Sequence, residues 1–178
     1  MKQSRTQDMV YIAVFAALIT ICSWIAIPTA IPLTLQTLGI FLSVGLLGGK
    51  RGTMAVLTYI LMAAIGLPVL TGFRGGAGAL LGNTGGYVLG FLLSALLMWA
   101  MEKLPGNQKF IFALSMLLGL LICYAFGTAW FLLLYARMGQ SAALGTVLAT
   151  CVFPFIMPDL LKIAGAILLT RRLKKHIK

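Results

Sequence analysis

The sequence is poor in charge, and above all in acidic charge. Of its 178 residues, 10% are charged, only 3 are Asp or Glu, and a single one is histidine. Metal centres and hydrolytic triads draw on clusters of such residues, so neither is predicted and no cofactor is expected. The 3 cysteines, Cys22, Cys123 and Cys151, lie within apolar runs and lack CxxC spacing. This pattern indicates buried free thiols rather than a disulfide or zinc ligands.

Apolar residues take the place of the missing charge. They make up 61% of the chain, and the mean hydropathy is +1.03, whereas soluble domains average about 45–50% apolar residues. A soluble domain of this size could not remove so much apolar surface from water. The composition therefore predicts an all-α integral membrane protein that is surrounded by membrane lipid.

Six apolar runs predict a single domain, residues 1–178, with six transmembrane helices. The runs cover residues 9–27, 35–48, 52–66, 87–101, 110–136 and 141–170. The first run follows Lys2 and Arg5, as a signal peptide would, but its 19 uncharged residues and the equally apolar chain after it favour a retained helix. The second run is short, so its outer end is expected to be loop-like.

The basic residues indicate how the helices are oriented. If both termini are cytoplasmic, 11 of the 14 Lys and Arg residues lie inside, Arg74 and Arg137 lie outside, and Lys162 lies in the membrane. The eleven are Lys2, Arg5, Lys50, Arg51, Lys103, Lys109, Arg171, Arg172, Lys174, Lys175 and Lys178. By the positive-inside rule we predict a multi-pass membrane protein with both termini inside and a basic cytoplasmic tail, residues 171–178. The formal charge of +11 then needs no nucleic-acid partner.

Asp159 and Lys162 are the most informative charges, because they lie near the middle of the sixth run. An ionisable group at that depth costs about 2.5–3.5 kcal/mol to insert, so such residues mark functional sites. Their i,i+3 spacing puts both on one helix face. Pro154 and Pro158 are expected to open the backbone just above them. The alternative is an internal ion pair that only holds helices together.

A glycine-rich segment precedes the fourth run and holds a second candidate site. Seven of the twenty glycines lie between Gly72 and Gly86, which favours irregular backbone that approaches a neighbour or a ligand closely. Asn83 offers both a donor and an acceptor to an amide-like or urea-like ligand, and Tyr87 follows closely. Alternatively, Asn83 or Thr84 only caps the fourth helix.

Further polar residues are expected in the outer loops. Thr34, Gln36 and Thr37 lie in the first outer loop, where they either close over a pocket or are ordinary loop residues. Arg74 either attracts an anionic solute or anchors at lipid headgroups.

Small residues suggest two close helix contacts. Ala13 and Ala17, four residues apart on the first helix, let another helix approach closely, although on spacing alone internal packing is the favoured explanation. For Gly119, Cys123 and Gly127 on the fifth helix we favour internal packing.

Five segments carry a family resemblance that covers most of the chain. They are residues 31–37 (IPLTLQT), 50–52 (KRG), 59–69 (YILMAAIGLPV), 82–91 (GNTGGYVLGF) and 158–162 (PDLLK). Together they resemble the BioY-type biotin transporters, which are the substrate-binding S components of energy-coupling factor (ECF) transporters. Asn83 departs from the family pattern, because many relatives are expected to have proline there.

The resemblance implies a six-helix S component in the bacterial cytoplasmic membrane, with an outward-facing biotin pocket under the first and third outer loops. It also implies that Ala13 and Ala17 face the transmembrane T component, which couples to two ATPase subunits. The expected substrate-binding residues are Asp159, Lys162, Asn83, Tyr87, Gln36, Thr34 and Arg74. In our hypothesis Asp159 accepts from a ureido N–H of biotin, Lys162 donates to the ureido carbonyl, and Asn83 completes the set. Alternatively, Lys162 binds the valerate carboxylate.

Three rival functions are weighed against biotin transport. An S component or facilitator for another small vitamin would have the same topology with a different specificity. An intramembrane enzyme would use Asp159 as acid or base, but the sequence lacks a second convergent carboxylate, a His dyad or a Ser–Lys pair. A structural subunit would bind no ligand at all. We therefore expect no enzymatic activity.

Overall fold

The apolar runs fold into helices, as the sequence predicts. The computed structural model describes residues 5–27, 32–139 and 143–175. The elements in these ranges are α1 (Arg5–Trp24), β1 (Ala26–Ile27), β2 (Leu33–Thr34), α2 (Gln36–Leu47), α3 (Gly49–Ala64), α4 (Ala77–Leu80), α5 (Gly85–Glu102), α6 (Gln108–Arg137), α7 (Leu144–Cys151) and α8 (Phe153–Leu173). β1 and β2 form a small antiparallel pair. Four features used in the sequence analysis lie outside the described residues: Lys2, Ile31, residues 141–142 of the sixth run and residues 176–178 of the basic tail.

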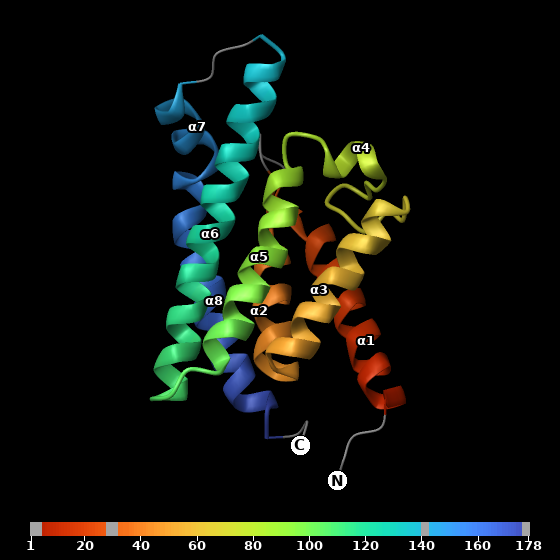
Figure 1. Ribbon diagram of the computed structural model, residues 1–178, viewed down its shortest axis with the longest axis vertical. Coiled ribbons are helices and arrows are strands. Elements are labelled where there is room, and N and C mark those ends of the chain that lie inside the picture. Colours follow the sequence, from red (N-terminus) through yellow and green to blue (C-terminus); the bar gives the residue numbers. More distant parts are fainter. Residues whose placement is uncertain (1–4, 28–31, 140–142, 176–178) are drawn as a thin grey trace.

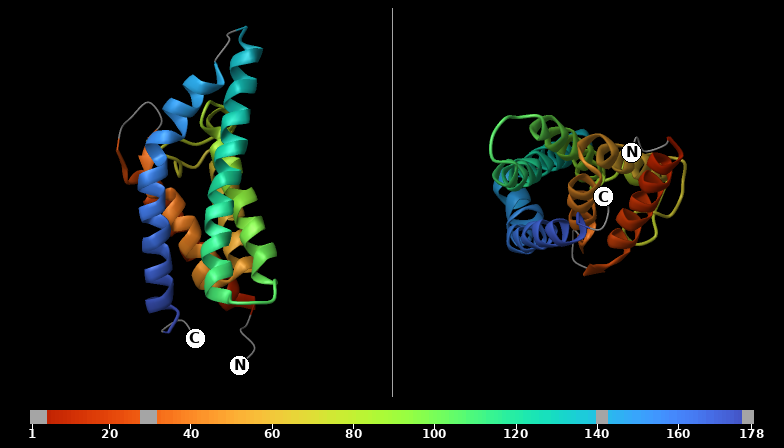
Figure 2. Two further views of the ribbon diagram at one scale, coloured as in Figure 1. Left: turned by 90° about the vertical axis from the view of Figure 1, so that its left-hand side faces the viewer. Right: turned by 90° about the horizontal axis from the view of Figure 1, so that it is seen from below.

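Successive long helices run in opposite directions along the molecule (Figure 1). α1, α3 and α6 lead away from the end at which Arg5 lies, whereas α2, α5 and the α7–α8 pair lead back to it. α2 is the central helix: it packs against α1, α3, α5 and α8, as the view along the bundle shows (Figure 2). Every residue of α2 from Gly39 to Leu47 is buried. α4 and the rest of the segment 65–84 lie at the end opposite Arg5.

Four helical stretches of the described chain are long and apolar enough to cross a membrane. They are Arg5–Trp24, Gly85–Glu102, Gln108–Arg137 and Leu144–Leu173. α2 has only 12 residues and rises about 18 Å, less than the hydrocarbon core of about 30 Å, as its short apolar run predicts. Large apolar side chains point outward, such as Leu121 (60% exposed) on α6 and Leu161 (73% exposed) on α8. Such a surface is suited to lipid rather than to water.

The last apolar run forms two helices, where one was expected. α7 and α8 are separated at Val152, whose backbone (φ −125°, ψ −57°) leaves the helical region. Pro154 explains the break, because proline lacks the N–H that would bond to a preceding turn and is tolerated in the first turn of a new helix. Pro158 lies inside α8 without ending it. The helix break lies at the α7–α8 junction, and Pro158 supplies no N–H to the carbonyl of Pro154 one turn earlier.

Two polar residues lie on a helix where a loop was expected. Gln36 and Thr37 are the first residues of α2. Thr34 accounts for this helix start, because its Oγ1 accepts the backbone N–H of Gln36 at 3.2 Å, one of the donors that a helix N-terminus leaves unpaired. Thr84 is the N-cap residue of α5, at one of the two positions predicted, but its side chain makes no capping hydrogen bond.

Small residues let α5 and α6 pack closely. A Cβ at Gly127 of α6 would collide with the ring of Tyr87 on α5, and a Cβ at Gly119 would collide with Ser94. Cys123, between these two glycines, is buried against α5. The interpretation of this stripe as a packing contact is therefore confirmed. As a consequence, the ring of Tyr87 is held on the α6 backbone, at the wall of the cavity described next.

Candidate functional site

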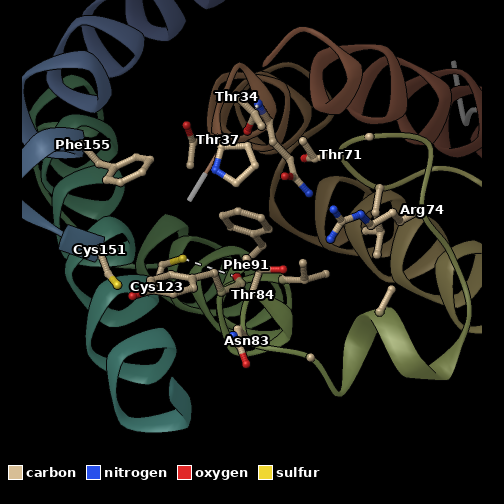
Figure 3. A pocket seen from close by; sticks show the side chains of 18 of the residues that line it. Thr34, Thr37, Thr71, Arg74, Asn83, Thr84, Phe91, Cys123, Cys151 and Phe155 are labelled. Atoms are coloured by element: carbon tan, nitrogen blue, oxygen red, sulfur yellow. Dashed lines mark hydrogen bonds between the residues drawn. The ribbon is translucent and has the colours of Figure 1, made fainter. Parts of the chain in front are cut away.

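A cavity lies at the end of the bundle opposite Arg5, between the helices and the segment 65–84 (Figure 3). Its volume is about 460 Å³, within the range of small-molecule sites, about 300–1,000 Å³. The lining residues come from α2, α4, α5, α6, α7, α8 and the connecting segments: Pro32, Thr34, Gln36, Thr37, Leu70, Thr71, Gly72, Arg74, Gly78, Ala79, Gly82, Asn83, Thr84, Tyr87, Val88, Phe91, Cys123, Tyr124, Cys151, Phe155, Asp159 and Lys162.

The buried ion pair of α8 forms part of the cavity wall. Lys162 Nζ lies 2.7 Å from Asp159 Oδ1, and the two residues are only 8% and 3% exposed. One helical turn separates them, so both side chains project from the same face of α8. Burial of two charges is costly unless they pair with each other and their remaining lone pairs and protons form hydrogen bonds.

Two neighbouring helices supply the remaining partners of Asp159. Thr37 of α2 donates its hydroxyl to Asp159 Oδ1 at 3.0 Å. Tyr124 of α6 donates its hydroxyl to Asp159 Oδ2 at 2.5 Å. The carboxylate therefore accepts three hydrogen bonds, out of about four lone-pair sites. These bonds hold α8 to α2 and α6, as expected of an ion pair that only joins helices. Asp159 and Lys162 also line the cavity, and each retains hydrogen-bonding capacity that a ligand can use.

A second polar contact in the cavity wall joins α2 to α3. Gln36 is 5% exposed, and its Nε2 donates to the hydroxyl of Tyr59, which is completely buried, at 2.7 Å. This bond uses one amide proton of Gln36 and leaves the carbonyl oxygen of the side chain available. Gln36 can therefore present an acceptor to the cavity.

The segment 65–84 is fastened to α1 and carries two polar residues to the mouth of the cavity. Ser23 Oγ donates to the Val69 carbonyl at 2.6 Å, and Trp24 Nε1 donates to the Pro68 carbonyl at 3.1 Å. Arg74 and Asn83 are both exposed and line the cavity. Figure 3 shows Arg74 on the side of the cavity opposite Phe155 of α8.

The remaining wall is largely apolar and aromatic. Phe91 of α5 is buried, and Phe155, just after the α7–α8 junction, is half-buried. The hydroxyl oxygens of Tyr87 and Thr128 are 3.5 Å apart. The backbone carbonyl of Tyr87 accepts a hydrogen bond from the thiol of Cys123. A site of this kind accommodates a mostly apolar ligand that carries a few hydrogen-bonding groups.

The structure brings all seven predicted substrate-binding residues to this one cavity. They are Thr34, Gln36, Arg74, Asn83, Tyr87, Asp159 and Lys162. Sequence reasoning missed Tyr124 and Phe155. Tyr124 is one aromatic residue in a long apolar run, and only the fold shows that its hydroxyl meets Asp159. Phe155 has no sequence signal of its own, because it is one more aromatic residue in an apolar run and its neighbours Ile156 and Met157 are exposed.

Ala13 and Ala17 lie away from the cavity, on the outer face of α1. Both are exposed, as are Val10 and Val14 beside them. Internal packing, the alternative for this alanine pair, is therefore not their role within the described chain.

Comparisons with known proteins agree with this arrangement. The sequence matches the BioY family over residues 1–178. The biotin transporter BioY of Thermotoga maritima is 38% identical over 170 residues, which span 95% of this chain and 96% of the relative. The biotin transporter BioY of Rhodobacter capsulatus is 34% identical, spanning 96% of this chain and 94% of the relative. In the solved structures, the S-component for biotin from an ECF-type ABC transporter matches with a TM-score of 0.83 at 32% identity, covering 97% of this chain and 95% of that one. The chain belongs to the BioY family.

Proposed function

We propose that this protein binds biotin in the cavity and delivers it across the cytoplasmic membrane as the S component of an ECF transporter, without catalysing a reaction. One observation carries the proposal: in a chain of the BioY family, a buried and hydrogen-bonded Asp–Lys pair lines a partly aromatic cavity of about 460 Å³.

The hydrogen-bonding capacity left at the pair matches the ureido ring of biotin, which has two N–H donors and one carbonyl acceptor. Asp159 accepts from a ureido N–H, since three of its roughly four lone-pair sites are used. Lys162 has three donors, of which one goes to Asp159, so it donates to the ureido carbonyl. Gln36 and Asn83, which both carry an amide, and the hydroxyl of Thr34 complete the polar set.

Arg74 is the cation that we assign to the valerate carboxylate of biotin. It makes no ion pair within the described residues and lies at the mouth, where the tail of a ligand with a buried ureido ring would emerge. Lys162 is less suited to bind the valerate carboxylate, because the charge of Lys162 is already neutralised by Asp159 deep in the cavity. The thioether ring and the tail then lie against Tyr87, Phe91 and Phe155.

The membrane topology belongs to the same proposal: one domain with six spans and both termini cytoplasmic. It is supported by the alternating helix directions, which bring Arg5 and Leu173 to the same end of the bundle (Figure 1). Arg51, Lys103 and Lys109 lie at helix ends on that side, whereas the cavity lies at the opposite end. The cavity therefore faces outward.

We assign the outer face of α1 to the T component, which couples to two ATPase subunits. Ala13 and Ala17 are exposed, and small side chains let a helix of the partner approach closely. Ala17→Leu should abolish co-purification with the coexpressed T component and ATPase subunits while biotin binding persists. Ala164→Leu, on the exposed face of α8, is the matched control. Unaffected co-purification of the Ala17 variant would refute this assignment.

Calorimetry on detergent-purified protein tests the proposed substrate. The wild-type chain should retain stoichiometric biotin or bind it after removal, and Asp159→Asn should bind it far more weakly. Asp8→Asn is the matched control, because Asp8 is half-exposed and pairs with Arg51 at the other end of the bundle. A folded Asp159→Asn variant with wild-type affinity would exclude the proposed ureido contact, and a wild type that binds no biotin would exclude the function.

A further inference from the structure

A second cavity lies at the opposite end of the bundle from the proposed biotin site. It has a volume of about 250 Å³ and is enclosed by the last turns of α2, α5 and α8 and the first turns of α6. This volume is below the range of complete small-molecule sites, about 300–1,000 Å³. The cavity therefore suits one part of a larger, extended ligand.

The walls of this cavity are apolar, and its rim is basic. Val44, Met98 and Phe112 provide apolar wall surface. Lys109 at the start of α6 and Arg171 and Lys174 at the end of α8 surround the opening, and all three are exposed. Arg171 and Lys174 are three residues apart and so project from one face of α8.

The positive charge of the rim is not balanced by the chain itself. None of the three cations forms an ion pair within the described residues. Glu102 also lines the cavity, but its Oε2 accepts the backbone N–H of Gly49 at 2.6 Å. The carboxylate is thereby held toward the start of α3.

The cavity wall also holds a polar group without a partner. Thr170 is 5% exposed, lines the cavity, and its Oγ1 is buried without a hydrogen bond. A hydroxyl in the interior usually bonds back to its own helix or to a neighbour. A ligand oxygen that enters the cavity would satisfy it.

We propose that this cavity binds an anionic phospholipid of the cytoplasmic leaflet. The phosphodiester lies among Lys109, Arg171 and Lys174, its ester oxygens reach toward Thr170, and the start of an acyl chain fills the apolar part. Charge complementarity selects an anionic headgroup, because each basic side chain near a membrane surface favours it. The apolar wall selects a lipid over a soluble phosphate. The assignment to this leaflet rests on the membrane topology proposed above.

Native mass spectrometry of protein from nanodiscs tests the proposal. The discs contain phosphatidylcholine with or without phosphatidylglycerol. The site variant is Lys109→Gln/Arg171→Gln/Lys174→Gln. The control is Lys103→Gln/Arg172→Gln/Lys175→Gln, which removes the same charge from exposed residues at the same end that do not line the cavity. We expect the wild type and the control to retain phosphatidylglycerol, and the site variant to retain it at least tenfold less.

Three results would overturn the proposal. Equal losses in both triple variants would mean diffuse charge attraction, and equal retention of phosphatidylcholine would mean that charge plays no part. Binding of glycerol 3-phosphate to the wild type in calorimetry, as tight as that of the lipid, would mean a site for a soluble anion. Biotin binding of the same preparations is measured separately and should be unchanged in the site variant. A failure of biotin binding alone therefore counts against the proposed function and not against the lipid site.

Discussion

The hydroxyl of Tyr124 on α6 donates to Asp159 Oδ2 on α8 at 2.5 Å, although the two residues are 35 positions apart in sequence. This hydrogen bond fixes the carboxylate on the side opposite Lys162, which binds the other oxygen. Tyr124 therefore orients the group that we assign to the ureido ring.

Tyr124→Phe should weaken biotin binding while the protein remains folded. A hydrogen bond to a charged group contributes about 1.5–3 kcal/mol, which corresponds to a roughly 10- to 150-fold rise in Kd. Calorimetric titration with biotin measures the effect. Tyr135→Phe is the matched control, because Tyr135 lies on the same helix, stacks on Phe131 and does not line the cavity. Equal affinities in the two variants would mean that Tyr124 does not orient the site.

Replacement of the whole ion pair should separate its structural role from its binding role. Loss of one buried partner typically costs about 3–5 kcal/mol, whereas replacement of both by apolar residues is often neutral or stabilising by about 1–4 kcal/mol. We therefore expect Asp159→Leu to lower the Tm strongly, and Asp159→Leu/Lys162→Met to restore it. Thermal unfolding in detergent, followed by circular dichroism, measures both.

The double variant should nevertheless bind no biotin, because it offers neither an acceptor nor a donor to the ureido ring. Biotin binding by a stable double variant would contradict the proposed role of the pair. A double variant that stays as unstable as Asp159→Leu would mean that the pair mainly holds α8 to α2 and α6.

The packing of α5 on α6 should determine the position of Tyr87 in the cavity. Gly127→Ala places a methyl group against the ring of Tyr87, and overpacking of this kind costs about 1–3 kcal/mol. We expect a lower Tm together with weaker biotin binding. Gly145→Ala on α7 is the control, since a Cβ there meets no atom within 4 Å. A lower Tm with unchanged affinity would show that Tyr87 does not contact the ligand.

Some parts of the fold and the site could be predicted from the sequence because they stand out against an apolar background. Asp159 is one of only three acidic residues, so its depth in the sixth run was visible at once. Arg74 could be identified as one of two basic residues on the outer side, and Asn83 as an amide within the glycine-rich segment. Apart from the last run, the helices could be located within a few residues, since most apolar runs are bounded by charge, glycine or proline.

Other parts depend on contacts that hydropathy does not record. The apolar run continues unbroken through Val152, so its hydropathy does not reveal the division between α7 and α8. Pro154 causes this division by interrupting the backbone hydrogen bonds of the helix. Tyr124 has no sequence signal, because its partner lies on another helix. Gln36 has the polarity of a loop residue, and only the structure shows that the hydroxyl of Thr34 accepts its backbone N–H at the start of α2.

Substitution of Arg74 should show which end of biotin lies at the mouth of the cavity. If it binds the valerate carboxylate at the solvent-exposed mouth, Arg74→Gln should weaken biotin binding by roughly fivefold, the upper range for an exposed ion pair. The methyl ester of biotin has no charge on the tail, so the same variant should bind it as well as the wild type does. Calorimetric titration of biotin and of its methyl ester into the wild type and into Arg74→Gln measures this difference. Arg137→Gln is the control, because Arg137 lies at the end of α6 and does not line the cavity. If Lys162→Met instead weakens the binding of biotin but not that of its methyl ester, and Arg74→Gln affects neither ligand, the carboxylate lies against Lys162 and the ligand has the reverse orientation.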